Sequence, residues 1–454
     1  MDTIYEIMIL IENAHIVNEG RIIKGAILVK NDSIDSIYKG EAPASVREKA
    51  TQVIDASDCW VMPGVIDDHV HFRDPGMTEK ADFYTESKAA LAGGVTSVMD
   101  MPNTNPSTVS LDAWKDKMAM IGQKSLVNYS CYLGATNTNL DDVLAADPTA
   151  VCGIKLFIGS STGNLLVDDN AAMTAIFSKV KALVAVHAED NAIIAANVAK
   201  LKEQYGEDLP VSLHPQVRSH EACFKATSWA VNMARKYGTR LHVMHISTEK
   251  ELALFEDKPL TDKLITAETC PQYLVFDASH FETLGARIKC NPAIKLSTDK
   301  NALLKAVATN RIDVIGTDHA PHLLSQKEGN ALTAVSGMPG IQYSLPLMLT
   351  LAKQGVLSVE QVVEKMCHNP ARLYRMEKRG FIRKGYKADL VVVRRSDKKE
   401  ITASDVLSKC GWSPYEGMTL PVSVAYTFVN GRPVYANGII DETTKGEALR
   451  FVQD

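Results

Sequence analysis

The chain has 454 residues, of which 46% are hydrophobic and 23% charged, and its 49 basic and 54 acidic residues give a formal net charge of −5. This composition is typical of a globular protein with about two or three domains. The mildly acidic balance argues against a dedicated nucleic-acid binder, which needs a basic face, and no apolar run is long enough to predict a membrane span.

Short strands joined by turns are predicted at both ends of the chain. Residues 1–60 contain apolar runs separated by turn residues, and residues 376–454 show the same pattern with little helical periodicity. In the second segment the Asn430–Gly431 pair lies between apolar residues, which is typical of a two-residue hairpin turn. We therefore predict that the two ends together form one small β-sandwich domain.

The N-terminal segment does not look like a secretory signal. Its apolar run carries acidic residues and lacks both a basic flank and a small-residue cleavage site, which favours an edge strand instead. The eight cysteines are scattered and include no C-x-x-C pair, so a disulfide framework is not expected. These features predict a protein of the reducing cytoplasm.

The middle of the chain, residues 61–375, alternates between apolar runs and amphipathic segments with helical periodicity. Apolar runs without polar alternation suit parallel strands that are buried on both faces. Eight strand–helix units predict an α/β fold, a (β/α)8 TIM barrel. The alternative is an open doubly wound sheet, but no Gly-rich phosphate-binding sequence follows the first strand. The eight predicted strands are 61–72, 94–103, 126–134, 151–159, 182–190, 240–248, 263–270 and 312–322.

Polar side chains follow most of these strands at their carboxyl ends, where barrel enzymes carry their active sites. His69 and His71 are two residues apart on one strand, so both side chains leave the same face. Strands three and seven offer no titratable group of comparable interest. The residues expected to converge are His69, His71, Asn103, Lys155, His187, His245, Asp318, His319 and His322.

The number of converging imidazoles predicts a metal site. A single histidine at a strand end is more often a hydrogen-bonded structural residue, but four of them with a carboxylate form the donor set that zinc prefers. Lys155 is the exception, because an ammonium has no lone pair for a metal. The conflict disappears if its amine takes up carbon dioxide and becomes a carbamate, an anion whose oxygens can bridge two metals. The histidines assigned structural roles are His15, His214, His242, His280 and His368.

Six short motifs resemble the amidohydrolase superfamily and, within it, the dihydroorotase family of cyclic amidases. The resemblance covers essentially the whole chain, including the C-terminal "KGYKADLVVV". It implies a metal-dependent hydrolase barrel over residues 61–375 that reversibly hydrolyses dihydroorotate to N-carbamoyl-L-aspartate in de novo pyrimidine biosynthesis. The motifs, in chain order, are "GVIDDHVHFRDPG", "MPNT", "GIKLFIG", "VHAED", "MHIST" and "GTDHAPH".

The resemblance also implies roles for individual residues. Two Zn²⁺ ions are expected, with N-carboxylated Lys155 bridging them and Asp318 acting as general base and then general acid. The other implied ligands are His69 and His71, which share one ion with Asp318, and His187 and His245 on the second ion.

The substrate contacts implied by the resemblance are Arg73, Asn103 and His322 at the substrate carboxylate, with Asn291 at the ring. A guanidinium offers a planar fork of donors that matches a carboxylate. The alternative for Arg73 is an ion pair with a neighbouring aspartate, Asp74 or Asp68. Two further features bear on this pocket. The polar segment 323–337 is expected to be a mobile wall, and Gln342 stands where many relatives carry glutamate, a position at which allantoinases also have glutamine.

Other functions remain open at this point. An allantoinase or hydantoinase would share the metal chemistry, but Arg73 with His322 argues against it. A non-catalytic partner of aspartate transcarbamoylase typically loses metal ligands, and all six are present here. Lys155 disfavours a mononuclear deaminase. The resemblance implies a small-molecule substrate, a homodimer and association with aspartate transcarbamoylase, with no nucleic-acid or membrane partner.

Overall fold

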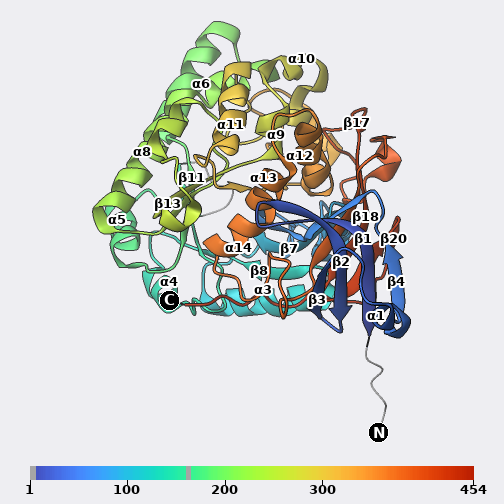
Figure 1. Ribbon diagram of the computed structural model, residues 1–454. Helices are drawn as coiled ribbons and strands as arrows, with labels where there is room; N and C mark the ends of the chain where they lie inside the picture. The colour runs from blue at the N-terminus through green and yellow to red at the C-terminus, as the bar shows by residue number, and fades with distance from the viewer. Residues whose placement is uncertain (1–6, 160–164, 454) are drawn as a thin grey trace.

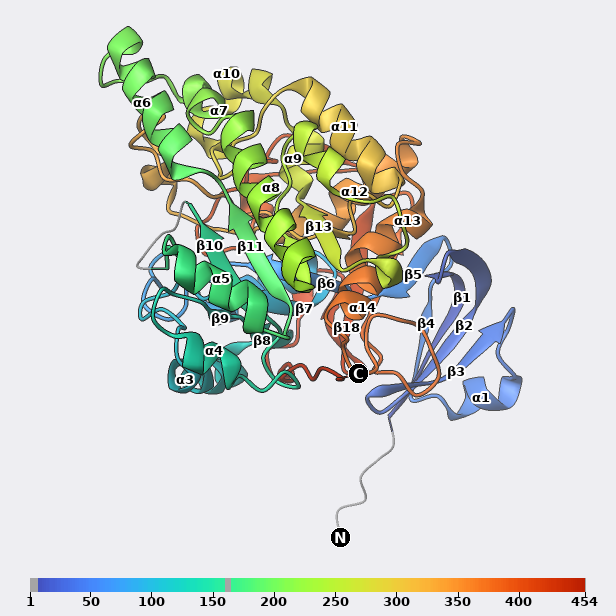
Figure 2. The same ribbon diagram turned by 90° about the vertical axis from the view of Figure 1, so that its left-hand side faces the viewer.

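The structure is a computed structural model that describes residues 7–159 and 165–453. Strands and helices from the middle of the chain form a parallel α/β core, and strands from both ends form a separate sheet at one side of it (Figures 1 and 2). The predicted α/β class is therefore confirmed.

Parallel strands form the centre of the core at each of the eight predicted positions, and the third is split in two by Tyr132. They pair in two sheets with the orders β6-β7-β8 and β14-β13-β12-β11-β10-β9. A parallel bridge between Val70 and His319 links the first strand to the segment after the last one. The strands are β6 (Val65–Val70), β7 (Val95–Asp100), β8 (Asn128–Cys131), β9 (Leu133–Gly134), β10 (Ile154–Ile158), β11 (Val184–Ala188), β12 (Leu241–Val243), β13 (Ile265–Thr269) and β14 (Val314–Ile315).

Helices cover the outer side of these strands (Figure 2). In α8, Ala222, Ala226 and Ala230 recur at helical spacing on the buried face, so small side chains let the helix lie close to the strands. The Ser219 side chain caps its first turn, and Gly238 ends it in a left-handed conformation. The longer helices are α2 (Phe83–Ala92), α3 (Leu111–Lys124), α5 (Asn170–Lys179), α6 (Asn191–Tyr205), α8 (His220–Tyr237), α11 (Ser297–Ala308) and α12 (Ser344–Lys353). The shorter ones are α1 (Ala44–Lys49), α4 (Leu140–Leu144), α7 (His214–Val217), α9 (Pro271–Val275), α10 (Phe281–Leu284), α13 (Val359–Val363) and α14 (Asn369–Leu373).

The sheet at the side of the core contains strands from both chain ends, in the order β20-β19-β18-β15-β5-β1-β2-β3, with β4 also paired to β1. The two ends meet where β15 runs antiparallel to β5, with Val392 opposite Val61. The strands are β1 (Met8–Asn18), β2 (Arg21–Lys30), β3 (Ser33–Lys39), β4 (Gln52–Asp55), β5 (Cys59–Pro63), β15 (Leu390–Arg394), β18 (Ser423–Val429), β19 (Arg432–Ala436) and β20 (Ile439–Ile440); β16 (Lys399–Glu400) and β17 (Thr419–Leu420) pair separately.

Two local predictions for this sheet have opposite outcomes. The hairpin turn at Asn430–Gly431 is confirmed, since both residues have the positive φ, 48° and 77°, that a tight hairpin turn between β18 and β19 requires. The edge-strand prediction for the N-terminal segment is wrong, because β1 has partners on both sides. Residues 1–6 of that segment lie outside the described residues.

Two C-terminal segments return to the core after leaving the sheet. Residues 446–449 run beside β8, where the Leu449 amide donates to the Tyr129 carbonyl at 2.8 Å. Residues 401–418 lie beside the segment after β14, and the Trp412 indole donates to the His322 carbonyl at 2.8 Å. Among the described residues, no helix has both the length and the apolar character that a membrane crossing needs.

Candidate metal and substrate site

A cavity of about 570 Å³ lies at the carboxyl ends of the parallel strands. Its volume is in the range of sites for small molecules. Of the residues expected to converge, His319 does not line this cavity, and its Nε2 lies 2.8 Å from Glu86 Oε2 instead. The predicted residues that line the cavity are His69, His71, Arg73, Asn103, Lys155, His187, His245, Asn291, Asp318 and His322.

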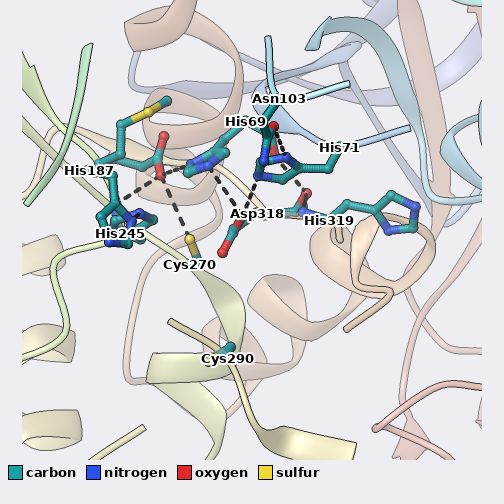
Figure 3. A network of polar contacts seen from close by, with 12 residues as sticks. His69, His71, Asn103, His187, His245, Cys270, Cys290, Asp318 and His319 are labelled. Atoms are coloured by element: carbon teal, nitrogen blue, oxygen red, sulfur yellow. Dashed lines mark hydrogen bonds and ion pairs between the residues drawn. The ribbon is translucent and has the colours of Figure 1, made fainter. Parts of the chain in front are cut away.

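Three of these side chains form one compact donor group. The Nε2 atoms of His69 and His71 lie 3.2 Å and 3.1 Å from Asp318 Oδ1. Both rings point toward this carboxylate (Figure 3), and the three ligand atoms lie within 4.8 Å of one another. Asp318 has a left-handed backbone, with φ 49°, which is uncommon outside glycine and frequent at functional sites.

The second pair of histidines lies on the other side of His69. His187 Nδ1 and His245 Nε2 are 2.9 Å apart, and the His69 and His245 ring centroids are separated by 5.3 Å. Lys155 is buried near them, and its ammonium donates to Met244 Sδ at 2.8 Å. Burial lowers the pKa of Lys155 to about 8.

Burial also determines the protonation of the imidazoles. It lowers the pKa of His69, His187 and His245, so these rings are neutral near pH 7, the form that binds metals. Burial alone would raise the pKa of Asp318, but His69 and then His71 outweigh it and lower this pKa. His69, His187 and His245 are therefore neutral donors near the ionised carboxylate of Asp318.

Each of three histidines has one ring nitrogen held by a partner outside the donor group. His69 Nδ1 lies 2.8 Å from Glu268 Oε1, and His71 Nδ1 lies 2.8 Å from Asn103 Oδ1. His187 Nε2 lies 3.0 Å from Glu189 Oε2, and Arg218 also donates to that carboxylate. Such contacts hold metal-binding imidazoles in one tautomer and orientation.

The contact of Glu268 corrects the prediction that strand seven offers no titratable group of interest. Glu268 lies on β13, is fully buried and touches a predicted ligand. The available signal was that Glu268 is the one charged residue of β13. Glu189, in the "VHAED" motif, was missed in the same way.

The donors fit a divalent metal. Imidazole nitrogens converge with a carboxylate in a buried cavity, and the buried His245 Nδ1 has no hydrogen-bond partner within the described residues. A second group with metal-ligand geometry, Asp68, His242 and Glu268, lies fully buried below the first. This second group holds one histidine between two carboxylates.

Positive charge dominates the other end of the cavity. Arg73 Nε donates to the Pro321 carbonyl at 3.0 Å, and Arg73 Nη2 lies 2.9 Å from His322 Nε2. Lys80 Nζ lies 3.4 Å from His322 Nδ1. Asp74 pairs with Lys124 at 2.6 Å rather than with Arg73. Burial lowers the pKa of Arg73 to about 10, so it remains a cation near pH 7.

Basic side chains also outnumber acidic ones in the lining of the cavity as a whole. Among the described residues that line the cavity, Asp318 is the one carboxylate, against five basic side chains. A cavity with this balance attracts an anionic ligand. The basic residues are Arg73, Lys80, Lys155, Arg218 and Lys289.

The remaining predicted substrate contact, Asn291, lies at the cavity wall with Oδ1 3.1 Å from His214 Nε2. Within the wall segment 323–337, the buried Lys327 ammonium donates to the Val335 and Gly337 carbonyls at 2.6 Å and 2.7 Å, and it ties the segment to its surroundings by donating to the Lys289 carbonyl at 3.0 Å. Mobility of this wall stays a prediction.

Gln342 does not line the cavity. Its amide nitrogen donates to the Asp405 carbonyl at 2.6 Å, and its amide oxygen accepts from the Leu407 amide at 2.9 Å. The side chain therefore holds residues 401–418 against the core. This departure from many relatives acts on that segment and not on a wall of the cavity.

A core of parallel strands with converging imidazoles at their carboxyl ends defines the class of protein. Residues 60–434 match the model of the amidohydrolase family, and the chain belongs to that family. It is 32% identical to a dihydroorotase of Methanosarcina acetivorans, over 97% of this chain and 94% of the relative. It is 31% identical to an allantoinase of Bacillus velezensis, over 95% of this chain and 94% of the relative. The solved L-hydantoinase of Arthrobacter aurescens superposes with a TM-score of 0.89 at 28% identity, over 95% of this chain and 97% of that one.

Proposed function

We propose that this chain is a dihydroorotase, which reversibly hydrolyses the cyclic amide of dihydroorotate to N-carbamoyl-L-aspartate in de novo pyrimidine biosynthesis. One observation carries the proposal: the cavity has a group of metal-binding donors at one end and the Arg73–His322 cation pair at the other. A cyclic amide that also bears a carboxylate would occupy both ends. Dihydroorotases among the relatives at 32% identity and above support it.

The architecture that goes with this function is a closed (β/α)8 barrel. The continuity of β8 with β9 and the bridge from Val70 to His319 support closure of the ring of strands. The proposed domains are the barrel over residues 61–375 and a β-sandwich domain built from residues 1–60 and 376–454. The sheet that joins both chain ends supports the second domain.

The proposed cofactor is a pair of Zn²⁺ ions. His69, His71 and Asp318 would hold one ion, and His187 and His245 the other. Lys155 is buried at the same cavity, where a carbamate on Nζ would supply anionic oxygen ligands. Two bound cations would acidify water and polarise the amide carbonyl of the substrate.

Asp318 would carry the proton in this reaction. Its carboxylate lines the cavity at the end that carries the donor group, and His69 and then His71 lower its pKa despite its burial. It would accept the proton of the attacking water and return it to the ring nitrogen that leaves. In ring closure the same carboxylate would act in reverse.

The carboxylate of the substrate would bind at the cationic end. The Arg73 guanidinium presents donors in a plane, and the neutral His322 ring adds a further donor or acceptor. Asn103 would contribute from the wall next to His71, and Asn291 would contact the ring of the substrate. These contacts select dihydroorotate over cyclic amides that have no carboxylate.

A second candidate function is that of an allantoinase or hydantoinase, because relatives of both kinds match nearly the whole chain. Such an enzyme would use the same metal chemistry without needing a carboxylate contact. A non-catalytic partner of aspartate transcarbamoylase is a third candidate, and the complete donor set argues against it.

The test is a side-by-side assay of ring opening with dihydroorotate, allantoin and hydantoin, using zinc-loaded protein treated with bicarbonate. We expect a strong preference for dihydroorotate. Activity on the other two rings alone would contradict the substrate and retain the metal chemistry. No activity in the presence of two bound metals would favour the non-catalytic function.

The other predictions keep their status as predictions. They are a homodimer, association with aspartate transcarbamoylase, a cytoplasmic location, and the absence of nucleic-acid and membrane partners.

A further inference from the structure

We infer that Glu268 is a positioning residue that orients one ligand of each proposed metal ion at once; this inference rests on the proposed metal site. A single oxygen, Glu268 Oε1, lies 2.8 Å from His69 Nδ1 and accepts from the His245 backbone amide at 3.1 Å. His69 belongs to one donor group and His245 to the other. The two ligands come from distant strands, and this carboxylate lies between them on β13.

The contact with His69 determines which ring nitrogen can bind a metal. An ionised carboxylate can only accept, so Nδ1 carries the proton and donates it to Oε1. The lone pair is then on Nε2, the atom that faces Asp318 Oδ1 at 3.2 Å. A carboxylate in this position also makes the imidazole a stronger ligand.

The contact with His245 stabilises an unfavourable backbone conformation. His245 has φ 43°, in the left-handed region, which is strained for residues other than glycine. The bond from its amide to a buried carboxylate offsets this strain and holds the ring with Nε2 2.9 Å from His187 Nδ1. Without the bond the backbone would relax, and the ring would turn away from its partner.

Glu268 also belongs to the fully buried group with Asp68 and His242. Its other oxygen, Oε2, lies 3.6 Å from His242 Nε2, which lies 3.5 Å from Asp68 Oδ2. Tyr374 donates to the same Asp68 oxygen at 2.9 Å. A Cβ on Gly316 would lie 2.8 Å from both Glu268 Oε2 and Asp68 Oδ1, so the carboxylates need glycine at this point of the last strand.

A hydrogen bond with Thr266 fixes the orientation of the His242 ring within this group. The Thr266 hydroxyl donates to the Leu241 carbonyl, so it accepts from His242 Nδ1 at 2.8 Å. Nε2, the opposite nitrogen, faces Asp68 Oδ2 and Glu268 Oε2 at 3.5 Å and 3.6 Å, which is ion-pair distance without a direct hydrogen bond.

The test uses Co²⁺, which reports ligand geometry through its visible spectrum, in the full chain. Glu268→Gln keeps the side-chain shape and removes the charge. The matched control is Glu251→Gln, which changes another buried glutamate that accepts from Thr227 and Thr248 and contacts no proposed ligand. Stoichiometry, the Co²⁺ spectrum and the Kd from chelator competition are measured for each protein.

We expect Glu268→Gln to bind Co²⁺ about 10- to 100-fold more weakly, with a changed spectrum, and Glu251→Gln to match the wild type in both. Glu268→Asp retains the charge at a shorter reach and should fall between them, which keeps the test decisive if Glu268→Gln fails to fold. If the Glu268 variants bind Co²⁺ with the affinity and spectrum of the wild type, the inference about Glu268 is wrong and the proposed metal site is unaffected. A wild-type chain that binds no Co²⁺ would overturn the proposed metal site as well.

Discussion

Arg73 and His322 are 249 residues apart in the chain, and the guanidinium Nη2 of Arg73 lies 2.9 Å from the imidazole Nε2 of His322. Lys80 approaches the same ring from its other nitrogen. Burial, then Arg73 and Lys80, lower the pKa of His322, so the ring is neutral. Arg73 and Lys80 therefore place a net positive charge around the neutral His322 ring. A bound carboxylate would balance this charge.

Replacement of Arg73 should therefore weaken substrate binding. We expect Arg73→Met to raise the KM for dihydroorotate by at least about tenfold, because a charge-assisted hydrogen bond contributes roughly 1.5–3 kcal/mol, with a smaller change in kcat. Initial-rate kinetics measure both. Lys124→Met, which removes the partner of the neighbouring Asp74, is the control. A KM equal to that of the wild type would refute the role of Arg73.

Removal of the Lys155 amine should remove the proposed bridge between the metals. Lys155→Ala is expected to lose bound zinc and activity, and short carboxylic acids should restore part of both by occupying the vacated space. Metal analysis and ring-opening rates provide the readout. Lys365→Ala, at another fully buried lysine outside the cavity, should retain its zinc. Full activity of Lys155→Ala without an added carboxylic acid would contradict the proposal that Lys155 carries a carbamate.

Asp318→Asn tests the proposed proton carrier. The amide keeps an oxygen toward the cavity but cannot take up a proton near pH 7, so kcat should fall by about 10²- to 10⁴-fold. Metal content is measured on the same samples, since Asp318 is also a proposed ligand. A variant with full metal content and unchanged kcat would show that the proton passes elsewhere.

Gln342→Glu should destabilise the protein and leave substrate binding unchanged. A glutamate would turn a donor to the Asp405 carbonyl into a second acceptor, which costs about 1–3 kcal/mol. The expected result is a lower Tm with wild-type KM. A raised KM at unchanged Tm would instead place Gln342 in control of the substrate pocket.

His242 should make stability depend on pH. Burial alone would lower its pKa, but Asp68 and Glu268 outweigh burial and raise the pKa to about 9; Tyr374 is the other titratable group at this cluster. A raised pKa means that the stabilisation is fully present below the ordinary value of 6.5 and is lost as the pH rises through about 9.

The change amounts to at most about 3 kcal/mol. The comparison is denaturant unfolding of the wild type and of His242→Gln at pH 6 and pH 9.5. We expect the advantage of the wild type to shrink at the higher pH. An advantage that is the same at both values would mean that His242 is not protonated in the folded protein.

The parallel core and the main site residues could be predicted from the sequence for a physical reason. Strands buried on both faces must be apolar along their length, so a polar residue at a strand end stands out. His69, His71 and His187 were found in this way, and ten of the predicted residues line one cavity. The hairpin at Asn430–Gly431 follows equally from local backbone preference.

The missed features depend on contacts between distant segments. The edge-strand prediction for β1 failed because its neighbours β2, β4 and β5 depend on the folding of a whole sheet. Gln342 could not be placed because its partners lie 63 and 65 residues further along the chain.

By itself the sequence determined the strand–helix alternation, the family and the chemical types at the site, because these follow from periodicity and residue identity. Only the tertiary structure decided which nitrogen of each histidine is available and what holds it there. In the sequence Glu268 is only the one charged residue of β13, and its contacts with His69 and His245 form when the strands pack together. Whether a hydrogen bond forms depends on donor–acceptor distances to within a few tenths of an ångström, and folding sets those distances.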